Sequence, residues 1–481
     1  MQDIQNFLIT IVSVAFVLGI MILVHEWGHY AVAKLLGVRV EVFSIGFGKR
    51  LWGFRRGDTD YRISLLPLGG YVRMAGESPL ETRTGDPGEF MSHSRWHRFL
   101  IVTAGPAMNL LLAVGLLTAV YMVRYEYPAF LDDKPPVVGW VGKDSPAAKA
   151  GVRPGDRIIR IENVQHPGWD DLAYKVSLSP AQPVELWVLR GGQTLDLSLV
   201  PETVGPSHIG DAGWIPDEPI QVGRIEPGLP ADRAGMKAGD QVIALNGTPV
   251  GELEIASDAA RAQVLGPDGK PVREVQLDRG PRLMIEVLIL YMQQNGEKPL
   301  EIAVLRGGQE MKFNVAPVMT DLDGAKRYRI GFAAPSLTHV NQLPPAQAFA
   351  KSIEDNRRYT LLIVELVQKM VQRKVSFKQI EGPISIARAS GDAARQRGWT
   401  PLLQLMAAIS LNLGILNLFP IPILDGGVLL LLMIEGTLRR DISLRIKERV
   451  YQAAFVFLVL FAVMVIYNDL GKLPGLGRYL P

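Results

Sequence analysis

The chain is 481 residues long, with 48% apolar residues, 21% charged residues and a mean hydropathy of +0.15. At roughly 100–200 residues per domain it is too long for one domain, and its apolar fraction excludes a mainly disordered protein. A formal net charge of +3 argues against a nucleic-acid partner, and the absence of cysteine excludes disulfides, thiolate metal ligands and a cysteine nucleophile.

Four uncharged runs are long enough to cross a lipid bilayer as helices. They cover residues 7–24, 99–123, 402–424 and 450–467. A helix needs about 20 apolar residues to span the hydrocarbon core. The first run lacks the basic start and the small-residue cleavage site of a signal peptide, so we expect it to be retained. The sequence therefore predicts a four-span α-helical membrane core in a multi-domain protein, with membrane segments at 1–36, 99–124, 399–435 and 450–468.

Basic residues are concentrated in the segments that follow the first and third spans. Lysine and arginine are frequent between the first two spans, including residues 76–98, and again at 436–449. The positive-inside rule predicts that both segments are cytoplasmic loops. The termini and residues 125–400 then face the opposite side, which in a bacterium is the periplasm. We therefore predict a multi-pass protein of the bacterial inner membrane.

The long segment between the second and third spans contains an internal repeat. Residues 138–159 match residues 222–243, and the matched pairs are 84 residues apart. A second matching string, VLRGGQ at 188–193 and 304–309, is 116 residues apart, so the second copy is 32 residues longer. We expect the extra residues within 251–281, where glycine, proline and charged residues dominate. Short strands joined by Gly-Asp turns predict a small β-rich module in each copy.

The shared pattern of Pro-Ala, Ala-Gly and Gly-Asp pairs resembles PDZ domains of the circularly permuted type that accompanies proteases. The resemblance implies two tandem periplasmic PDZ domains, mainly β with some helix, at 135–205 and 219–320. PDZ domains bind peptide C-termini or extended segments by adding a strand to a sheet edge, so such peptides are expected partners of at least one copy. The alternative is that one copy serves only as a spacer.

The connecting segment at 321–398 includes a predicted amphipathic helix. Residues 344–374 alternate apolar and charged side chains with helical spacing. Such a helix can lie on the membrane surface or pack on the second module, and the sequence does not decide between the two.

The chemically distinctive string is His25-Glu26-Trp27-Gly28-His29, at the end of the first apolar run. Residues i and i+4 share one face of a helix, so both imidazoles can point at a single ion. Zinc suits them because it accepts nitrogen and oxygen donors in a tetrahedral arrangement. Glu26 cannot reach the same coordination site and is placed to act on a water at the metal. The alternative is a helix end that merely carries charge, but an ionisable cluster at the end of a span indicates function.

A third protein ligand is needed, and cysteine cannot supply it. Asp425 is the carboxylate at the end of the third apolar run, just after two asparagines and two prolines. Broken backbone at membrane depth is tolerated only where protein buries it or where it lines a wet cavity. His25 and Asp425 both lie at the predicted cytoplasmic ends of their runs, so the same depth is expected for both. Their spacing along the sequence does not by itself show that His25 and Asp425 bind the same ion.

Three motifs together resemble the site-2 protease family of intramembrane metalloproteases. They are the H-E-x-x-H at 25–29, Gly105-Pro106-x-x-Asn109 in the second span, and N-x-F-P-x-P-x-x-D-G-G at 417–427. The strings VRVEVFSIGFGKRLW at 38–52, LLPLGGYV at 65–72 and EGPISIA at 381–387, with the tandem repeat, extend the resemblance over nearly the whole chain. Val428 departs from the family, since relatives often have histidine after Asp-Gly-Gly, and the insert in the second copy is unusual.

The resemblance implies one Zn²⁺ per chain, held by His25, His29 and Asp425, with Glu26 as the catalytic base. It also implies a membrane-associated β-hairpin region at 37–75, whose edge strand helps to hold an unwound substrate. The residues expected to contact substrate are Asn412, Asn417, Pro420, Pro422, Gly46 and Phe47.

The predicted function is therefore that of an intramembrane zinc endopeptidase that performs regulated intramembrane proteolysis of single-pass membrane proteins. The resemblance implies an anti-sigma factor already trimmed by a first protease, with remnant signal peptides as a second substrate class. The alternative is a membrane-anchored PDZ adaptor with a structural metal, which has no use for a carboxylate at Glu26. A metal transporter is disfavoured because the second and fourth spans have almost no polar residues.

Overall fold

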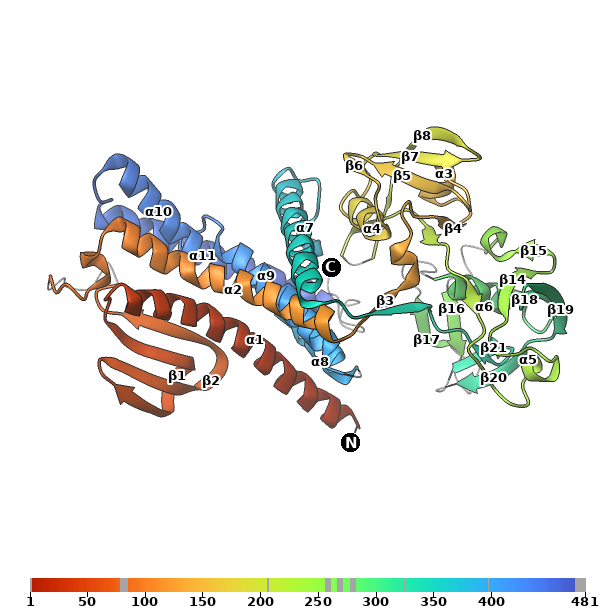
Figure 1. The fold of residues 1–481 in the computed structure, drawn as a ribbon, viewed down its shortest axis with the longest axis horizontal. Helices are drawn as coiled ribbons and strands as arrows, with labels where there is room; N and C mark the ends of the chain where they lie inside the picture. The colour runs from red at the N-terminus through yellow and green to blue at the C-terminus, as the bar shows by residue number, and fades with distance from the viewer. Residues whose placement is uncertain are drawn as a thin grey trace. The chain divides into compact units, whose positions relative to one another are not determined.

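The structure, a computed structural model, describes residues 2–77, 85–205, 207–255, 261–265, 271–276, 283–322, 325–396 and 398–471. The chain forms two compact units, each described by itself below (Figure 1). The first unit comprises Met1–Tyr125, Asn341–Glu365 and Ile380–Pro481. The second comprises Glu126–Val340 and Leu366–Gln379.

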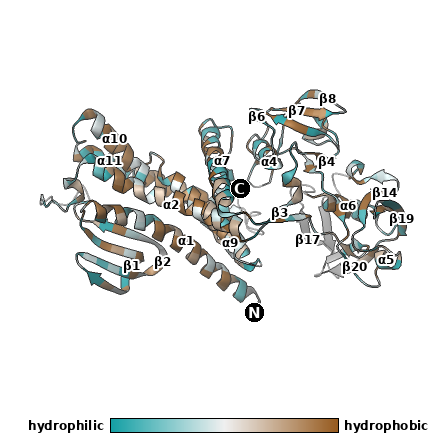
Figure 2. Ribbon diagram, viewed as in Figure 1, coloured by the Kyte–Doolittle hydropathy of each residue, from teal (hydrophilic) through white to brown (hydrophobic). Residues whose placement is uncertain are grey.

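Within the described residues, the first unit contains four helices that are long and apolar enough to cross a membrane, the number predicted. They are α1 (Gln2–Leu35), α2 (Arg95–Val123), α9 (Thr400–Asn417) and α11 (Leu444–Gly471). Figure 2 shows hydrophobic residues along most of the length of α1 and α2. The predicted break in the third span is present, because α9 ends at Asn417 and a separate helix, α10 (Asp425–Leu438), begins at Asp425.

Small residues let α2 approach α1 and α9 closely. A methyl group added at Gly28 of α1 would lie 2.4 Å from the carbonyl oxygen of Ala104, and one at Gly414 of α9 would lie 3.2 Å from that of Pro106. Helices in membranes pack by such close backbone approach, because lipid provides no hydrophobic force to press them together. The glycines therefore set the crossing points around which the site is built.

Residues 40–74 form an antiparallel sheet beside α1, in which two bent strands supply four legs (Figure 1). The long strands β1 (Val40–Arg56) and β2 (Thr59–Met74) each bend once, so that Val42 and Ile45 pair with residues on both sides. The order of the four legs is 70–74, 40–47, 59–66 and 50–56. Glycine permits the bends, since Gly48 has φ +87° and Gly69 has φ +141°. The leg 70–74 is therefore an edge of the sheet, which we call the edge leg.

Two further helices belong wholly or partly to this unit. In α7 (Pro345–Val371), Ser352 bonds Thr118 of α2 at 2.8 Å, whereas Lys369 bonds Ser179 of the first repeat copy at 3.0 Å. The C-terminal part of α7 thus contacts the first repeat copy, and the two alternatives given for this amphipathic helix stay predictions. The N-terminus of α8 (Pro383–Arg395) is capped by buried Asp469 of α11, which accepts backbone hydrogen bonds from three residues of the EGPISIA string, namely Gly382, Ile384 and Ser385.

The two repeat copies of the second unit share six elements in the same order. The first has α3 (Pro146–Lys149), β5 (Arg157–Ile161), β6 (Val164–Gln165), α4 (Trp169–Ser177), β7 (Val184–Arg190) and β8 (Gln193–Leu199). The second has α5 (Pro230–Arg233), β14 (Gln241–Leu245), β15 (Thr248–Pro249), α6 (Met284–Asn295), β18 (Leu300–Arg306) and β19 (Gln309–Val315). The sheets correspond, with β6-β5-β7-β8 in one copy and β15, β14, β18 and β19 joined alike in the other.

Each copy continues past the end predicted for it, because a late strand pairs with its first strand. In the first copy β11 (Trp214–Pro216) pairs with β4 (Val138–Val141), and in the second β22 (Phe332–Ala333) pairs with β13 (Arg224–Ile225). The predicted insert at 251–281 lies partly outside the described residues. The described part of it includes β16 (Arg261–Leu265) and β17 (Pro271–Gln276), which pair as an antiparallel hairpin.

An ion pair explains why the two distant repeat motifs occur together. Asp156, from the Gly-Asp turn, accepts hydrogen bonds of 2.6 and 2.7 Å from Arg190 of the VLRGGQ string. Asp240 and Arg306 make the same two bonds at the same distances in the second copy. Both aspartates are buried, so each needs its arginine partner to offset the loss of water. Each pair therefore ties the start of its sheet to the hairpin that completes it.

Candidate metal centre and active site

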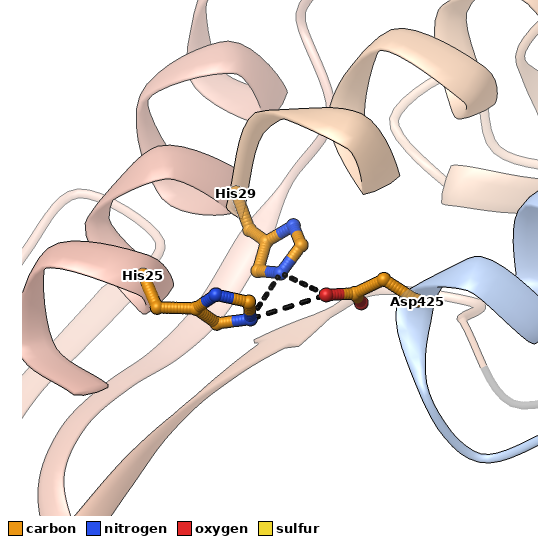
Figure 3. Close-up of side chains that lie close together, drawn as sticks. All are labelled: His25, His29 and Asp425. Carbon is orange, nitrogen blue, oxygen red and sulfur yellow. Dashed lines mark hydrogen bonds and ion pairs between the residues drawn. The ribbon is translucent and has the colours of Figure 1, made fainter. Parts of the chain in front are cut away.

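Three potential metal ligands converge from two helices that are four hundred residues apart in sequence. His25 and His29 are one turn apart on α1, and Asp425 is the first residue of α10. The Nε2 atoms of the histidines are 3.2 Å apart, and Asp425 Oδ2 lies 3.1 Å from His25 Nε2 and 3.5 Å from His29 Nε2 (Figure 3). Both histidines are buried. Among the described residues, this is the one cluster of three such side chains able to hold a metal ion.

The geometry of this cluster fits zinc. Tetrahedral zinc with bonds of 2.0–2.2 Å to nitrogen and oxygen places its ligand atoms about 3.3 Å from one another. The three observed separations, 3.1, 3.2 and 3.5 Å, lie around that value. Three protein ligands leave a fourth position free, which is the arrangement of catalytic zinc sites.

A backbone carbonyl fixes which nitrogen of His29 faces the cluster. Its Nδ1 lies 2.9 Å from the carbonyl oxygen of Ile101 in α2 and donates a hydrogen bond to it. The Nε2 lone pair is then free for a metal. The helix that carries Ile101 contributes no candidate ligand, yet it contacts both imidazoles.

The reason for a glycine in the G-P-x-x-N motif is steric. A methyl group added at Gly105 would lie 2.2 Å from His29 Nε2 and 2.9 Å from His25 Cε1. Only a residue without a side chain lets α2 pass against both rings at this point. The motif therefore belongs to the site although none of its residues is a candidate ligand.

The cluster opens into a cavity of about 730 Å³. Glu26 lines it together with the three candidate ligands, and one Glu26 carboxylate oxygen accepts a 3.0 Å hydrogen bond from the backbone N–H of Val72. Val72 lies on the edge leg of the sheet, so the carboxylate next to the ligands is held by the strand that borders the cavity. The cavity also contacts Val428, the position where relatives often have histidine.

The residues predicted to contact substrate lie in different places. Asn417, the last residue of α9, and Phe47 both line the cavity, and the Phe47 ring stacks on that of Tyr71 with centroids 6.0 Å apart. The others are not among the lining residues: Asn412 and Pro420 are exposed, Pro422 is half-buried in the turn before α10, and Gly46 packs against Leu66 within the sheet.

Several cavity residues were not predicted from the sequence. Tyr71 and Val72 lie in a string that was noted but had no assigned side-chain role, and Asn109 lies in a motif whose role was not stated. Glu435 and Lys447 also line the cavity and form a buried ion pair of 2.6 Å between α10 and α11. An ionisable residue inside an apolar segment is a signal of function, and this signal was present at Glu435 in the sequence.

Comparison with known proteins decides between the candidate activities. The profile of "Peptidase family M50" matches residues 13–461. The chain belongs to this family of site-2 proteases. It is 32% identical to a putative zinc metalloprotease of Vibrio cholerae, with 97% of this chain and 99% of the relative aligned. It is 30% identical to the regulator of sigma-E protease RseP of Salmonella typhimurium, with 95% of this chain and 97% of the relative aligned. It is 29% identical to the regulator of sigma-E protease RseP of Escherichia coli, with 97% of this chain and 100% of the relative aligned.

The protein is therefore a zinc metalloprotease with several membrane-spanning helices. This finding confirms the predicted enzyme class and the predicted cofactor. It contradicts the alternative of an adaptor whose metal is only structural, because the peptidase family matches residues 13–461 and the zinc metalloprotease relative aligns with 97% of this chain.

Proposed function

We propose that the protein is an endopeptidase that cuts single-pass membrane proteins within the bilayer, with His25, His29 and Asp425 as its zinc ligands and Glu26 as its general base. The observation that carries this assignment is the convergence of three ligand atoms, 3.1–3.5 Å apart, beside the carboxylate of Glu26 in one cavity. No other described group offers this combination.

The reaction is hydrolysis of a peptide bond. Zinc, when bound, polarises the scissile carbonyl and makes a neighbouring water more acidic. Glu26 accepts a proton from the attacking water and delivers it to the leaving nitrogen, so that the C–N bond breaks and a carboxylate and an amine are released. The hydrogen bond from Val72 holds one carboxylate oxygen of Glu26 and leaves the other for proton transfer.

The edge leg supplies a way to hold the substrate extended. An amide inside a helix is shielded by its own hydrogen bonds, and pairing with a sheet edge replaces those bonds with new ones. Gly70, Tyr71 and Val72 of this leg line the cavity, and Phe47 stacks beside them. We assign Asn417 and Phe47 to the substrate path on this basis. Asn412, Pro420, Pro422 and Gly46 stay predictions.

The biological role follows from the relatives. Two of them are named regulator of sigma-E protease, so we propose that this chain also performs regulated intramembrane proteolysis on an anti-sigma factor trimmed by a first protease. We further propose that the two repeat copies are periplasmic PDZ domains that bind peptide C-termini or extended segments, and that the protein resides in the bacterial inner membrane. The basic loops after the first and third spans support this orientation.

The test of the proposed chemistry is Glu26→Gln in detergent-purified protein with a single-pass model substrate. The amide fills the same space but cannot accept a proton, so we expect full zinc content and a loss of cleavage of about 10²- to 10⁴-fold. The matched variant Asp425→Ala should lose zinc as well as activity, because two imidazoles alone bind the ion weakly. Wild-type cleavage by the Gln variant would contradict the role of Glu26, and full zinc in the Ala variant would contradict the ligand set.

A further inference from the structure

His25, the other histidine of the pair, has an unusual neighbour. Its Nδ1 lies 3.3 Å from the side-chain amide of Asn109, whereas its Nε2 faces the metal cluster. Asn109 is 1% exposed, in the middle of α2, and its Oδ1 has no hydrogen-bond partner among the described residues. A buried amide in an apolar span costs free energy unless its hydrogen bonds are made, so this residue needs an explanation.

The chemistry of a metal-ligating histidine decides whether Asn109 must offer it a hydrogen-bond donor or an acceptor. A neutral imidazole that offers its Nε2 lone pair to zinc carries its proton on Nδ1, and that N–H needs an acceptor. The NH₂ group of Asn109 is not an acceptor, but its Oδ1 is. The two ends of an amide have nearly the same shape, so a half-turn of the side chain about its last bond brings Oδ1 to His25 Nδ1.

The backbone of Asn109 is held in place, so the half-turn involves its side chain alone. Its carbonyl oxygen accepts a 2.8 Å hydrogen bond from the hydroxyl of Ser410, which is fully buried on α9. The same segment of α2 supplies the carbonyl of Ile101 to His29. The two imidazoles would thus be oriented from one helix, one by a backbone oxygen and the other by a side-chain oxygen.

We propose that Asn109 is a positioning residue for zinc, whose Oδ1 accepts the Nδ1–H of His25 and so turns Nε2 of that ring toward the ion. This inference rests on the ligand set proposed above. Such outer partners of a metal-bound histidine set its tautomer and its basicity, and their loss costs about 10- to 100-fold in metal affinity.

The experiment measures zinc affinity, by competition with a chelator, for the detergent-purified full chain. We expect Asn109→Ala to bind zinc about 10- to 100-fold more weakly than the wild type. Asn109→Asp keeps an oxygen acceptor at the same place and is expected to retain most of the affinity. Ser390→Ala is the matched control, since it removes a buried hydrogen bond to the carbonyl of Ile386 within α8 without touching His25 or Asn109, and its zinc affinity should equal that of the wild type.

Melting temperatures of the metal-free variants separate positioning from packing. If Asn109→Ala binds zinc like the wild type, or if Asn109→Asp is as weak as Asn109→Ala, the proposal is wrong. It is also wrong if Ser390→Ala binds zinc as weakly as Asn109→Ala and loses as much metal-free stability. His25→Ala serves as the reference variant. If His25→Ala keeps the zinc affinity of the wild type, the proposed ligand set is wrong. If His25→Ala loses zinc affinity and Asn109→Ala does not, only the present inference is wrong.

Discussion

Gly105 allows a direct test of the idea that α2 shapes the metal centre without binding metal. A methyl group at this position would lie 2.2 Å from His29 Nε2, whereas ordinary contacts begin at 3.4 Å. Relieving the overlap moves the ring by about 1 Å, several times the roughly 0.2 Å by which a zinc bond can vary. We therefore expect Gly105→Ala to lower zinc affinity by at least about 100-fold and to abolish cleavage.

A shift of α2 would also relieve the overlap between a methyl group at residue 105 and His29, but it would break other contacts. A methyl at Gly28 would lie 2.4 Å from the carbonyl of Ala104, so α1 and α2 are already in backbone contact one residue away from Gly105. Moving α2 outward breaks this crossing and also separates Asn109 from His25. The first response displaces a candidate ligand, and the second withdraws the groups of α2 that contact both imidazoles.

Gly115 provides the matched control on the same helix, because a methyl there meets no atom within 4 Å. Alanine is the better helix former by roughly 0.5–1 kcal/mol, so Gly115→Ala should keep wild-type zinc content and cleavage with an equal or slightly higher melting temperature. The assay is elemental analysis of purified protein together with gel-based cleavage of a single-pass substrate. Wild-type zinc and cleavage in Gly105→Ala would refute the reasoning.

Two further predictions concern buried ion pairs. Glu435→Ala should destabilise the membrane unit by about 3 kcal/mol, measured by denaturing the detergent-solubilised protein, because it leaves Lys447 buried and unpaired. Adding Lys447→Met to this variant should recover part of the lost stability. The hydrogen bond from Arg306 holds the pKa of Asp240 below its ordinary value, so its contribution to stability is present above about pH 4 and is lost as the pH falls through the lowered pKa. Asp240→Asn should therefore lower the melting temperature at pH 7, followed by tryptophan fluorescence, and should reduce the amount by which the melting temperature falls in acid. Asp156→Asn removes a bond of the same length from the first copy and should lower the melting temperature by as much at pH 7.

The candidate ligands show which parts of the site local sequence patterns can predict. Helical periodicity alone puts His25 and His29 on one face of a span, because both lie on the same helix. Asp425 comes from another helix, and no local rule measures a distance across four hundred residues. Its pairing with the histidines rested on family resemblance, and the structure brings its oxygen within 3.1–3.5 Å of both. Hydrophobic runs gave the four spans, since length and composition suffice for that prediction.

The residues that the sequence did not reveal act through the backbone or through contacts between elements. Val72 meets Glu26 with its N–H group, which every residue but proline possesses, so nothing in its side chain marks the contact. The ends of the repeat copies were predicted too early because β11 and β22 are short strands that are defined only by their partners. The repeated Gly-Asp and Leu-Arg-Gly-Gly strings were used only to recognise the repeat, and the structure shows that they meet in the ion pair of Asp156 and Arg190.

The second span explains how a site assembled from distant segments can be rigid. It carries no candidate ligand, yet its residues 101–109 meet both imidazoles, α1 and α9 within little more than two helical turns. The carbonyl of Ile101 orients His29, Gly105 leaves room for both rings, and the Asn109 carbonyl accepts the hydroxyl of Ser410. Small and polar residues that would weaken an isolated apolar helix are therefore grouped where three helices meet. A change that alters the depth of α2 by a fraction of a turn should disturb every one of these contacts together, so substitutions here are expected to reduce zinc binding cooperatively and not additively.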